Sequence, residues 1–409
     1  MGLFDRITER RALSYQSIFR TGLDTFPPRP ESGFFVDANT ALRNPAVWAA
    51  QRLISNDIAT LPLEAFDKSG NRRIPIRPKP SWIEEPDPLD PGITRISHFQ
   101  QVVLSVLMDG NAYVLVEPDV LNPVRLEVLT PTLVRPHKDP GMDFPVYDVT
   151  NQRGQTLQTL TSFNVIHIAP FRKPGLIKGL SPIEAASEGV GIGLAAERYT
   201  GRFFLSGASM PGFITVPGDA TADQLAEMDR KLRQAKGGWR NAGVLGYLTG
   251  GAAYTPSGIS PKDSDLSAIR DFQIAEVERI YGIPAGMLTG ENKGKGTAGT
   301  EQMPVDYIAH CLRHYIEPIE AAYRRLIPGG LDTYLKFNVG GLLRGDIVSR
   351  YTAYNLGIRD SFMSVNDVRR LEEWDPIEGG DTYVQQSQMT DIAGTAKAAT
   401  SPDAPQNQG

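Results

Sequence analysis

The chain has a single cysteine, Cys311, among its 409 residues. One thiol cannot form a disulfide within the chain, which excludes a disulfide-stapled fold and fits a protein that assembles in a reducing cytoplasm. It also excludes a zinc site built from several thiolates. The sequence lacks any run that approaches the ~18 to 20 consecutive apolar residues of a membrane-spanning helix.

Targeting signals are also missing at the start of the sequence. The first residues, Met1 to Arg6, lack the basic start, apolar core and small-residue cleavage site of a secretion signal. A myristoyl anchor is not expected, because Arg6 stands where the acceptor pattern has Ser or Thr. We therefore expect no association with a membrane.

An excess of basic residues is absent as well. The 42 Lys and Arg residues are outnumbered by 47 Asp and Glu residues, which gives a formal net charge of -5. Proteins that grip nucleic acid tightly usually show the opposite balance. The length predicts two or more subdomains, and the hydrophobic fraction of 41% is ordinary for a folded protein.

Hydrophobic periodicity and capping residues predict an α+β fold. The clearest helix follows Asn44 as N-cap, has Pro45 at its first position and stops at Pro62. Further helices are expected over residues 96–108, 181–205, 222–235, 264–281, 304–327, 347–356 and 365–373. Strands are expected over residues 63–66, 112–116, 125–129, 145–150, 165–168, 244–248, 252–254 and 333–338. Pro318 should kink the helix that contains it.

The helix that begins at residue 181 carries a stripe of small residues. Ala185, Gly189, Gly193 and Ala196 lie on one face, at spacings of four, four and three. Each interior glycine, Gly191 among them, costs roughly 1 kcal/mol relative to alanine, so a gain elsewhere must offset it. A small-residue stripe lets another backbone approach closely, which predicts tight helix–helix packing and suggests a contact between subunits.

A Gly- and Lys-rich loop over residues 290–297 is similar to a phosphate-binding P-loop. It has three residues instead of four between Gly290 and Gly294, and Gly296 separates Lys295 from Thr297. It also follows a helix and a turn, whereas a P-loop follows a strand. A nucleotide-binding enzyme that uses this loop is the alternative hypothesis for the chain's function.

Other partial motifs favour packing over chemistry. Residues 191–196 match a loose dinucleotide fingerprint, but that fingerprint needs a preceding strand, and here the capping box starts ten residues earlier. His310 and His314 stand one helical turn apart without a third metal ligand, which favours solvated or interface histidines. We predict no catalytic residue, no metal and no cofactor.

Several short blocks follow one another in a specific order, and each alone is unspecific. They are Ile58–Leu63, Asp109–Tyr113, Val165–Ile168, Gly179–Ile183, Phe203–Phe204 with Gly207–Gly212, Ile280–Pro284 with Met287–Leu288 and Glu301–Gln302, Ser364–Arg369, and Gly379–Asp381. In this order they resemble the portal proteins of HK97-like tailed phages, which also occur in prophages and gene transfer agents. Asp367 stands where that pattern usually has Glu. The similarity covers roughly residues 40–382.

The resemblance implies a portal fold, with an α/β wing, a helical stem, a small α/β clip and a short helical crown. The implied segments are a flexible N-terminal arm (1–40), the wing (41–180), stem helix 1 (181–209), the clip (210–262), stem helix 2 (263–284), the tunnel loop with a long kinked helix and the return to the wing (285–344), the crown (345–390) and a disordered tail (391–409).

The resemblance also implies which residues face DNA. The tunnel loop would carry Asn292, Lys293, Lys295 and Thr297. Symmetry would repeat the two lysines around the channel as a ring of positive charge, and exposed phosphate contacts are weak and screened by salt, which suits moving DNA. A mobile surface loop without a role in DNA contact is the alternative.

The function implied is that of a portal and not of an enzyme. About a dozen copies would form a closed ring at one capsid vertex and pass double-stranded DNA during packaging and ejection. The ring would dock the large terminase and later the head-tail adaptors, and would contact the major capsid protein and scaffold. We expect it in the virion, after assembly in the bacterial host cytoplasm. The acidic balance is compatible with a conduit, since strong phosphate contacts would slow sliding DNA.

Overall fold

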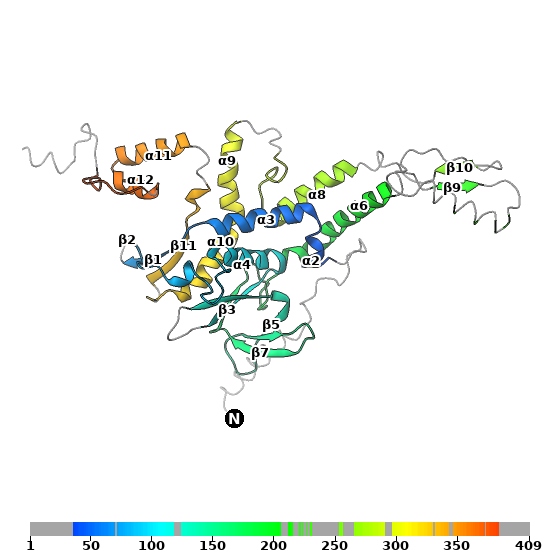
Figure 1. Cartoon of the computed structure of the whole chain (residues 1–409), viewed down its shortest axis with the longest axis horizontal. Helices are drawn as coiled ribbons and strands as arrows, with labels where there is room; N and C mark the ends of the chain where they lie inside the picture. Colours follow the sequence, from blue (N-terminus) through cyan, green and yellow to red (C-terminus); the bar gives the residue numbers. More distant parts are fainter. Residues whose placement is uncertain are drawn as a thin grey trace, which may run out of the picture. The chain divides into compact units, whose positions relative to one another are not determined.

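The computed structural model describes most of the chain between residues 36 and 383 (Figure 1). The described residues are 36–69, 72–117, 124–205, 212–215, 221, 223, 226, 230, 253–256, 266–290, 297–329, 332–342, 347–372 and 374–383. They divide into two compact units, Met1–Val339 and Gly340–Gly409. The first unit holds the residues of the wing, stem and clip predicted above, and each unit is described by itself below.

Two packed helices form the centre of the first unit. Helix α3, Pro45–Thr60, begins as predicted, with the Asn44 side chain accepting a hydrogen bond from the Ala46 amide at 3.0 Å. Helix α4, Arg95–Asp109, packs along it and ends at Gly110, whose φ of 70° is the left-handed conformation typical of a helix C-cap. A short helix, α2, Ala38–Ala41, precedes them.

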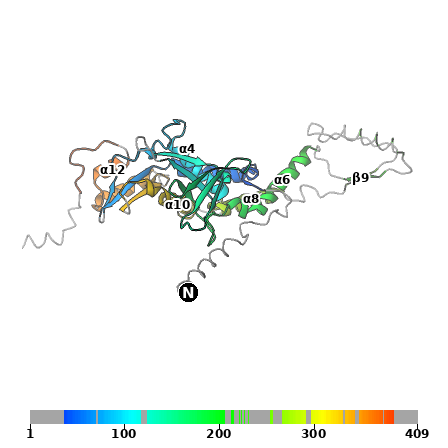
Figure 2. The same cartoon turned by 90° about the horizontal axis from the view of Figure 1, so that it is seen from below.

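The same unit contains three antiparallel sheets of three strands each, and Figure 2 shows this unit from below. The first pairs β11, Thr333–Phe337, with β1, Leu63–Ser69, and β1 with β2, Arg72–Pro75. The second has the order β4, Arg125–Leu129, β3, Ala112–Glu117, and β8, Val165–Ile168. The third has the order β5, Val134–His137, β6, Val146–Thr150, and β7, Thr156–Thr161. The second and third sheets share a core that includes Tyr113, Tyr147 and Leu160.

Strands β5 and β7 were not predicted from the sequence. The first four residues of β7 are all exposed, so the alternation of apolar and polar residues that identifies a half-buried strand is missing there. In β5, Pro136 has no amide hydrogen to donate to a neighbouring strand, so a strand was not expected there. Both strands exist because β6 lies between them and pairs with each.

Two long helices define the part of the chain predicted as the stem. Helix α6, Ser187–Leu205, packs against helix α8, Leu266–Tyr281. The single helix predicted from residue 181 is broken, because Ala186 has φ −105° and ψ 17° and separates a short helix, α5, Pro182–Ala185, from α6. The Ser181 hydroxyl caps α5 by accepting from the Glu184 amide at 3.1 Å.

Between α6 and α8, the structure describes one antiparallel strand pair. Strand β9, Gly212–Thr215, pairs with β10, Ala253–Pro256. The predicted strand 252–254 overlaps β10, whose described partner is β9. The strand predicted over 244–248, and most of the helix predicted over 222–235, lie outside the described residues.

The long helix after the loop is longer than predicted and is interrupted at another place. It starts at Thr297 as α9, Thr297–Tyr307, and passes through a π-helical segment, Ile308–Leu312, into α10, Arg313–Tyr323. The helix continues through Pro318, where the expected kink stays a prediction, and the π segment upstream is an irregularity that was not predicted. A π segment widens the helix by one residue per turn, and such segments occur frequently at functional sites.

The second unit contains two helices and a C-terminal segment folded onto them. They are α11, Ile347–Arg359, and α12, Val365–Leu371, which begins with a capping box between Ser364 and Asp367. Buried Asn366 exchanges hydrogen bonds with both backbone groups of Ile377, at 2.9 and 3.0 Å. A Cβ at Gly380 would collide with the Asn366 amide, so the closing Gly379–Asp381 block is needed for this turn to pass over α12.

Candidate functional site

The stripe of small residues on α6 faces α8 within the same chain. A Cβ added at Gly189 would lie 2.9 Å from a carboxylate oxygen of Glu276. A Cβ at Gly193 would lie 2.8 Å from the Asn44 side chain and 3.0 Å from that of Gln273. The distances to Glu276 and Asn44 are shorter than Cβ contacts in folded proteins, and the distance to Gln273 is shorter than most of them, so the glycines allow α6, α8 and the start of α3 to approach one another closely.

The two alanines of the stripe have other surroundings. Ala185 is exposed at the end of α5, and Ala196 is half-buried, with its carbonyl accepting a hydrogen bond from the Thr200 hydroxyl at 2.8 Å. The close packing of the stem helices is therefore made by the glycines. The subunit contact suggested for the whole stripe stays a prediction.

The end of α8 fixes the turn that leads into the predicted tunnel loop. Glu278 is only 3% exposed, and both of its carboxylate oxygens accept a hydrogen bond from the Gly286 amide at 3.0 Å. One oxygen also accepts from the Leu288 amide at 3.0 Å. Gly282, with φ 73°, ends the helix as predicted, close to the His310 carbonyl. The buried carboxylate thus holds the turn against the last turn of α8.

Buried polar contacts then tie this turn to α3 and to the π segment. The Gln51 side chain donates to the Tyr281 hydroxyl at 2.9 Å. The Cys311 thiol donates to the Tyr281 carbonyl at 3.2 Å, and burial raises the pKa of that thiol to about 12. Because the thiolate is the nucleophile and the metal ligand, a thiol with this pKa has a structural role.

A second tie holds the far side of the loop. The Tyr307 hydroxyl, at the end of α9, donates to the Asp57 carboxylate on α3 at 3.0 Å. Burial raises the pKa of Asp57, and the hydrogen bond from Tyr307 opposes that rise. We call the contacts of Gln51, Asp57, Glu278, Tyr281 and Tyr307 the loop base, because they hold both flanks of residues 291–296.

The residues predicted to face DNA stand at this place in the chain. Asn292, Lys293 and Lys295 lie outside the described residues, and Thr297 is the first residue of α9. The described flanks bear on the alternative hypothesis of a P-loop. That motif needs a strand immediately before it, whereas helix α8 and a turn precede residue 290 here. The dinucleotide-like residues 191–196 lie inside α6, without the strand that such a site requires.

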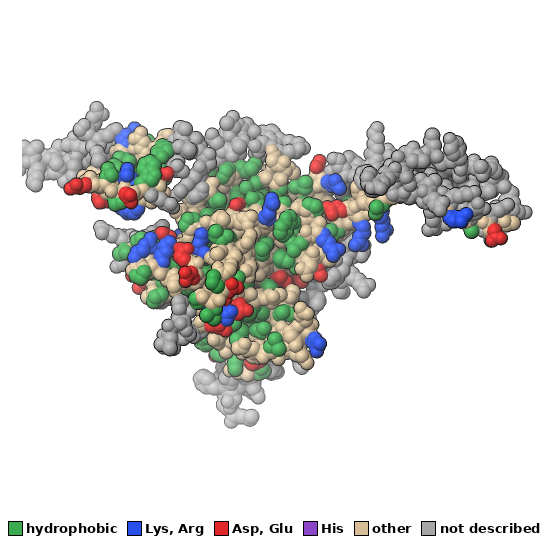
Figure 3. Space-filling view, viewed as in Figure 1, with side chains coloured by type: hydrophobic (Ala, Val, Ile, Leu, Met, Phe, Trp, Pro, Cys, Tyr) green, Lys and Arg blue, Asp and Glu red, His purple; other side chains and the backbone are tan. Residues whose placement is uncertain are grey.

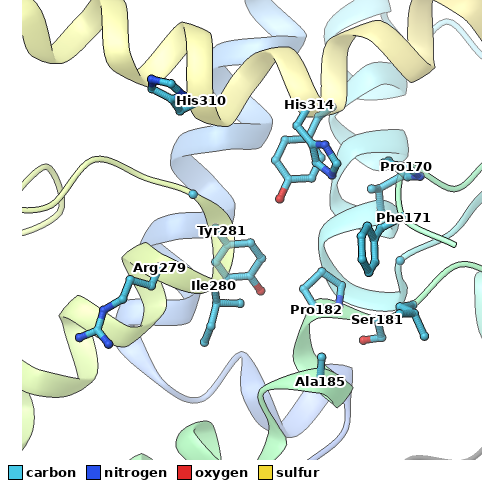
Figure 4. Close-up of a pocket in the computed structure, with 15 residues that line it drawn as sticks. Pro170, Phe171, Ser181, Pro182, Ala185, Arg279, Ile280, Tyr281, His310 and His314 are labelled. Carbon is cyan, nitrogen blue, oxygen red and sulfur yellow. The ribbon is translucent and has the colours of Figure 1, made fainter. Parts of the chain in front are cut away.

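A cavity of about 360 Å³ opens beside the loop base (Figure 4). In Figure 4 the rings of Tyr281, His314 and Phe171 line it, whereas His310 and the guanidinium of Arg279 point away from His314. The two histidines are exposed, and the described residues contain no group of three His, Cys, Asp or Glu side chains that could hold a metal ion. The geometry favours the solvated histidines expected from the sequence.

The Ser181 hydroxyl at the edge of this cavity has a structural role. Ser181 donates to the Met108 carbonyl at 2.7 Å and accepts from the Glu184 amide, so its hydrogen-bonding capacity is used in capping α5. No base stands in hydrogen-bond contact with this hydroxyl among the described residues, and a nucleophilic serine requires one. The cavity therefore supports no catalytic assignment.

Two of the sequence blocks meet next to this cavity. Asn111, which is fully buried, accepts from the Gly179 amide at 2.6 Å and donates to its carbonyl at 3.1 Å. Its side-chain oxygen is also 3.1 Å from Nε2 of His167. A Cβ on Gly110 would collide with the Leu180 carbonyl oxygen. The Asp109–Tyr113 and Gly179–Ile183 blocks therefore form a single backbone crossing that positions the start of α5.

Among the helices that the structure describes, none is both long enough and apolar enough to cross a bilayer.

Comparison with known protein families and structures gives concordant matches. The family model described as phage portal protein matches residues 45–373. The probable portal protein of Streptomyces phage phiC31 is 33% identical over 359 residues, covering 85% of this chain and 78% of that protein. The portal protein of Enterobacteria phage HK97 is 26% identical over 365 residues, covering 85% of this chain and 82% of that protein.

Solved structures agree on the fold. A crystal structure of an HK97-family phage portal protein from Corynebacterium diphtheriae matches with a TM-score of 0.55 and 16% identity, over 75% of this chain and 96% of that one. A chain of the neck of a native gene transfer agent particle, computed with C12 symmetry, matches with a TM-score of 0.55 and 21% identity. The match covers 89% of this chain and 99% of that one. The predicted α+β portal fold is confirmed, and the chain belongs to the phage portal protein family.

Proposed function

We propose that the chain forms a ring-shaped channel at one vertex of a tailed-virus capsid, through which double-stranded DNA enters and leaves. The observation that carries the proposal is the family match over residues 45–373, which spans the stem helices, the loop base and the first helices of the second unit. The similarity to a neck chain computed with C12 symmetry supports a closed ring of about a dozen copies.

The loop base supports a role for the loop in DNA contact. Contacts to α3 hold Tyr281 before the loop and Tyr307 after it, which gives both described flanks a common support. Lys293 and Lys295 on this loop would repeat around a ring as positive charge. Contacts of this kind are weak and fall with salt, which allows DNA to slide.

The proposed role is structural. The ring would dock the large terminase, whose ATP hydrolysis drives packaging, and later the head-tail adaptors, with the major capsid protein and scaffold around it. Among the described residues, no strand directly precedes the loop, as a P-loop would require, and no group of three His, Cys, Asp or Glu side chains could hold a metal ion. The product is a component of the virion, assembled in the bacterial cytoplasm.

Electron microscopy of the purified chain tests the proposal. Negative-stain images should show rings of about a dozen subunits, and the protein alone should not hydrolyse ATP. A monomer or dimer whose ATPase activity is abolished by Lys295→Ala would contradict the proposal and support the nucleotide-binding alternative.

The loop needs an experiment of its own. Replacing Lys293 and Lys295 together by Ala should leave ring formation unchanged and alter the salt dependence of DNA packaging, because phosphate contacts set that dependence. Arg153→Ala, on the exposed turn between β6 and β7, controls for the loss of a surface charge away from the loop. Packaging that is unchanged by the double substitution at every salt concentration would show that the loop has no role in DNA contact.

A further inference from the structure

The cavity beside the loop base has no part in the portal function proposed above. Its volume of about 360 Å³ lies within the range of small-molecule sites in proteins. Five segments that are distant in the sequence line it: residues 106–110, 170–171, 180–185, 279–282 and 310–315. A molecule in the cavity would contact several of these segments at once, and the chemistry of their side chains determines which molecule fits.

Aromatic rings lie on two sides of the cavity. In Figure 4 the rings of Tyr281 and Phe171 stand on opposite sides of the open space, with His314 above it and Pro182 below it. Tyr281 is buried, whereas Phe171 is 61% exposed and stands at the mouth. Aromatic rings prefer stacked or edge-to-face contacts with other rings. The lining therefore suits a flat aromatic ring that enters between Tyr281 and Phe171.

A buried phenol in the lining lacks a hydrogen-bond partner. Tyr315 is only 6% exposed, and burial raises its pKa, so its hydroxyl stays protonated and can donate. In the part of the chain that the structure describes, no group forms a hydrogen bond with this hydroxyl. The Tyr281 hydroxyl, by contrast, accepts from Gln51 at 2.9 Å and donates to the Leu107 carbonyl at 3.4 Å. Buried polar groups are normally paired, so an acceptor atom on a bound molecule would complete the lining at Tyr315.

Charge around the cavity has one sign. The visible surface of the chain carries basic and acidic side chains side by side (Figure 3), but the described lining contains Arg279, His310 and His314 and no Asp or Glu. The Arg279 guanidinium lies over the Phe272 ring at 5.6 Å from its centroid. In Figure 4 it stands at the end of the cavity opposite to Phe171. A lining with basic side chains alone favours an anionic group on the bound molecule.

We propose that the cavity binds a small, flat aromatic molecule that carries one anionic group. The aromatic ring lies between Tyr281 and Phe171, an acceptor atom receives the hydrogen bond from Tyr315, and the anionic group lies toward Arg279. Aromatic carboxylates and nucleoside monophosphates share this chemistry. The site is independent of the proposed ring and of DNA in the channel.

The observations favour a small molecule over a side chain of a partner protein. The cavity presents a ring-lined space, an unpaired donor at Tyr315 and a cation at Arg279. None of the unmodified amino-acid side chains combines an aromatic ring with an anionic group at neutral pH. One small molecule can contain both groups, whereas a peptide would need two side chains in a cavity near the lower size limit of ligand sites.

A bound molecule would also contact the loop base. Tyr281 contributes its ring to the cavity, its hydroxyl to the contact with Gln51 and its carbonyl to the contact with Cys311. A molecule that binds only the folded chain raises the melting temperature as its concentration increases. Binding should therefore be visible both as heat and as increased thermal stability.

Titration calorimetry of the full chain with matched pairs of compounds tests the proposal. Naphthylacetate represents the aromatic carboxylates, with naphthylacetamide as the same ring without charge and cyclohexylacetate as the same charge without an aromatic ring. Thymidine monophosphate represents the nucleotides, with thymidine as its uncharged counterpart. At least one of the two aromatic anions should bind saturably, with one site per chain, and about tenfold or more tighter than its controls.

Substitutions in the lining assign the binding to this cavity. Tyr315→Phe keeps the ring and removes the donor, and Arg279→Gln removes the charge, so each should weaken binding of the anion about tenfold. Ala185→Trp should fill the cavity and abolish binding. Phe171→Ala, at an exposed position, should weaken binding without affecting the fold. Arg153→Gln, on the exposed turn between β6 and β7, is the control, and circular dichroism verifies that each variant is folded.

The possible results lead to different conclusions. Affinities that depend on the charge, on the ring and on the lining residues support the site, and the anion that binds tighter identifies the source of the ligand. Absence of saturable binding by both anions at millimolar concentration overturns the proposal. Binding that is equal for the uncharged controls, or unchanged by Arg279→Gln and Phe171→Ala, overturns it as well. A partner protein whose binding is abolished by Ala185→Trp, while neither anion binds, would replace the small molecule as the occupant. None of these results alters the proposed portal function, which is tested by ring formation.

Discussion

Substituting Gly110 by Ala should be among the most destabilising single changes in the first unit. Gly110 ends α4 with φ 70°, and the hydrogen that a methyl group would replace points at the Leu180 carbonyl oxygen. The new Cβ would collide with backbone atoms, which cannot rotate away as a side chain can. The strand that follows and the segment before α5 would have to separate, and the hydrogen bonds of Asn111 to Gly179 would lengthen.

The magnitude has two parts. A residue other than glycine in the left-handed region costs about 1–2 kcal/mol. Forcing extra volume into a packed crossing costs typically about 1–3 kcal/mol, and more where backbone must move. We therefore expect a loss of about 2–5 kcal/mol. For domains of 150–250 residues, each kcal/mol lowers the melting temperature by about 2–4 °C.

Alanine substitutions at two other glycines measure the cost of backbone strain without the cost of a collision. Gly290 has the same φ of 70° and Gly154 has φ 78°, but a Cβ at Gly290 meets nothing within 4 Å, and one at Gly154 meets only Arg135 at 3.7 Å. Alanine at either position should cost the conformational part alone. Thermal unfolding is compared at one protein concentration, because ring assembly makes the melting temperature concentration-dependent. Equal shifts at the three positions would refute the close approach at Gly110.

Three further predictions concern the stem, α4 and the loop base. Gly193→Ala should destabilise the chain in thermal unfolding, because its Cβ would meet Asn44 and Gln273, whereas Gly201→Ala, with nothing within 4 Å, should stabilise it by about 1 kcal/mol through helix propensity. Burial raises the pKa of Asp109 from its ordinary value of 3.8 to about 6, so the contribution of its protonated form to folding stability is fully present below pH 4 and is lost as pH rises through 6. That loss amounts to about 1–3 kcal/mol, and Asp109→Asn should remove it from urea titrations at pH 4 and pH 7. Tyr307→Phe leaves the half-buried Asp57 carboxylate without its donor and should cost about 1–3 kcal/mol, and an unchanged unfolding midpoint would contradict that role.

Local signals in the sequence predicted the elements that depend on local chemistry. The start of α3 follows from Asn44 and Pro45, and the end of α8 follows from Gly282, because caps are made by residues adjacent in the chain. Strand β7 depends on its partner β6, and its exposed residues carry no periodic pattern. The π segment after Tyr307 is held by contacts to α3 and to Tyr281, none of which is visible in the helix's own sequence.

The composition of residues 290–297 predicted a loop, and its role in DNA contact, implied by the resemblance, stays a proposal. The contacts on the two sides of the loop were not predicted from the sequence. Glu278 was missed, because a glutamate next to Val277 in a helix gives no sign that it is buried and holds two distant amides. Its only sequence signal is the turn-forming segment that follows, with Pro284 and Gly286. The glycines of α6 were predicted to pack closely, but only the structure identifies α8 as their partner.

Both flanks of the loop are fastened to one helix. Gln51, which holds Tyr281, and Asp57, which holds Tyr307, are six residues apart on α3, or about 9 Å along its axis. These two described contacts are made by residues on either side of 291–296. If this segment lines the proposed channel, changes in its length and charge would alter the bore and the affinity for DNA, while the contacts to α3 stay the same. In protein engineering, α3 would therefore support both ends of loops that differ in length and charge.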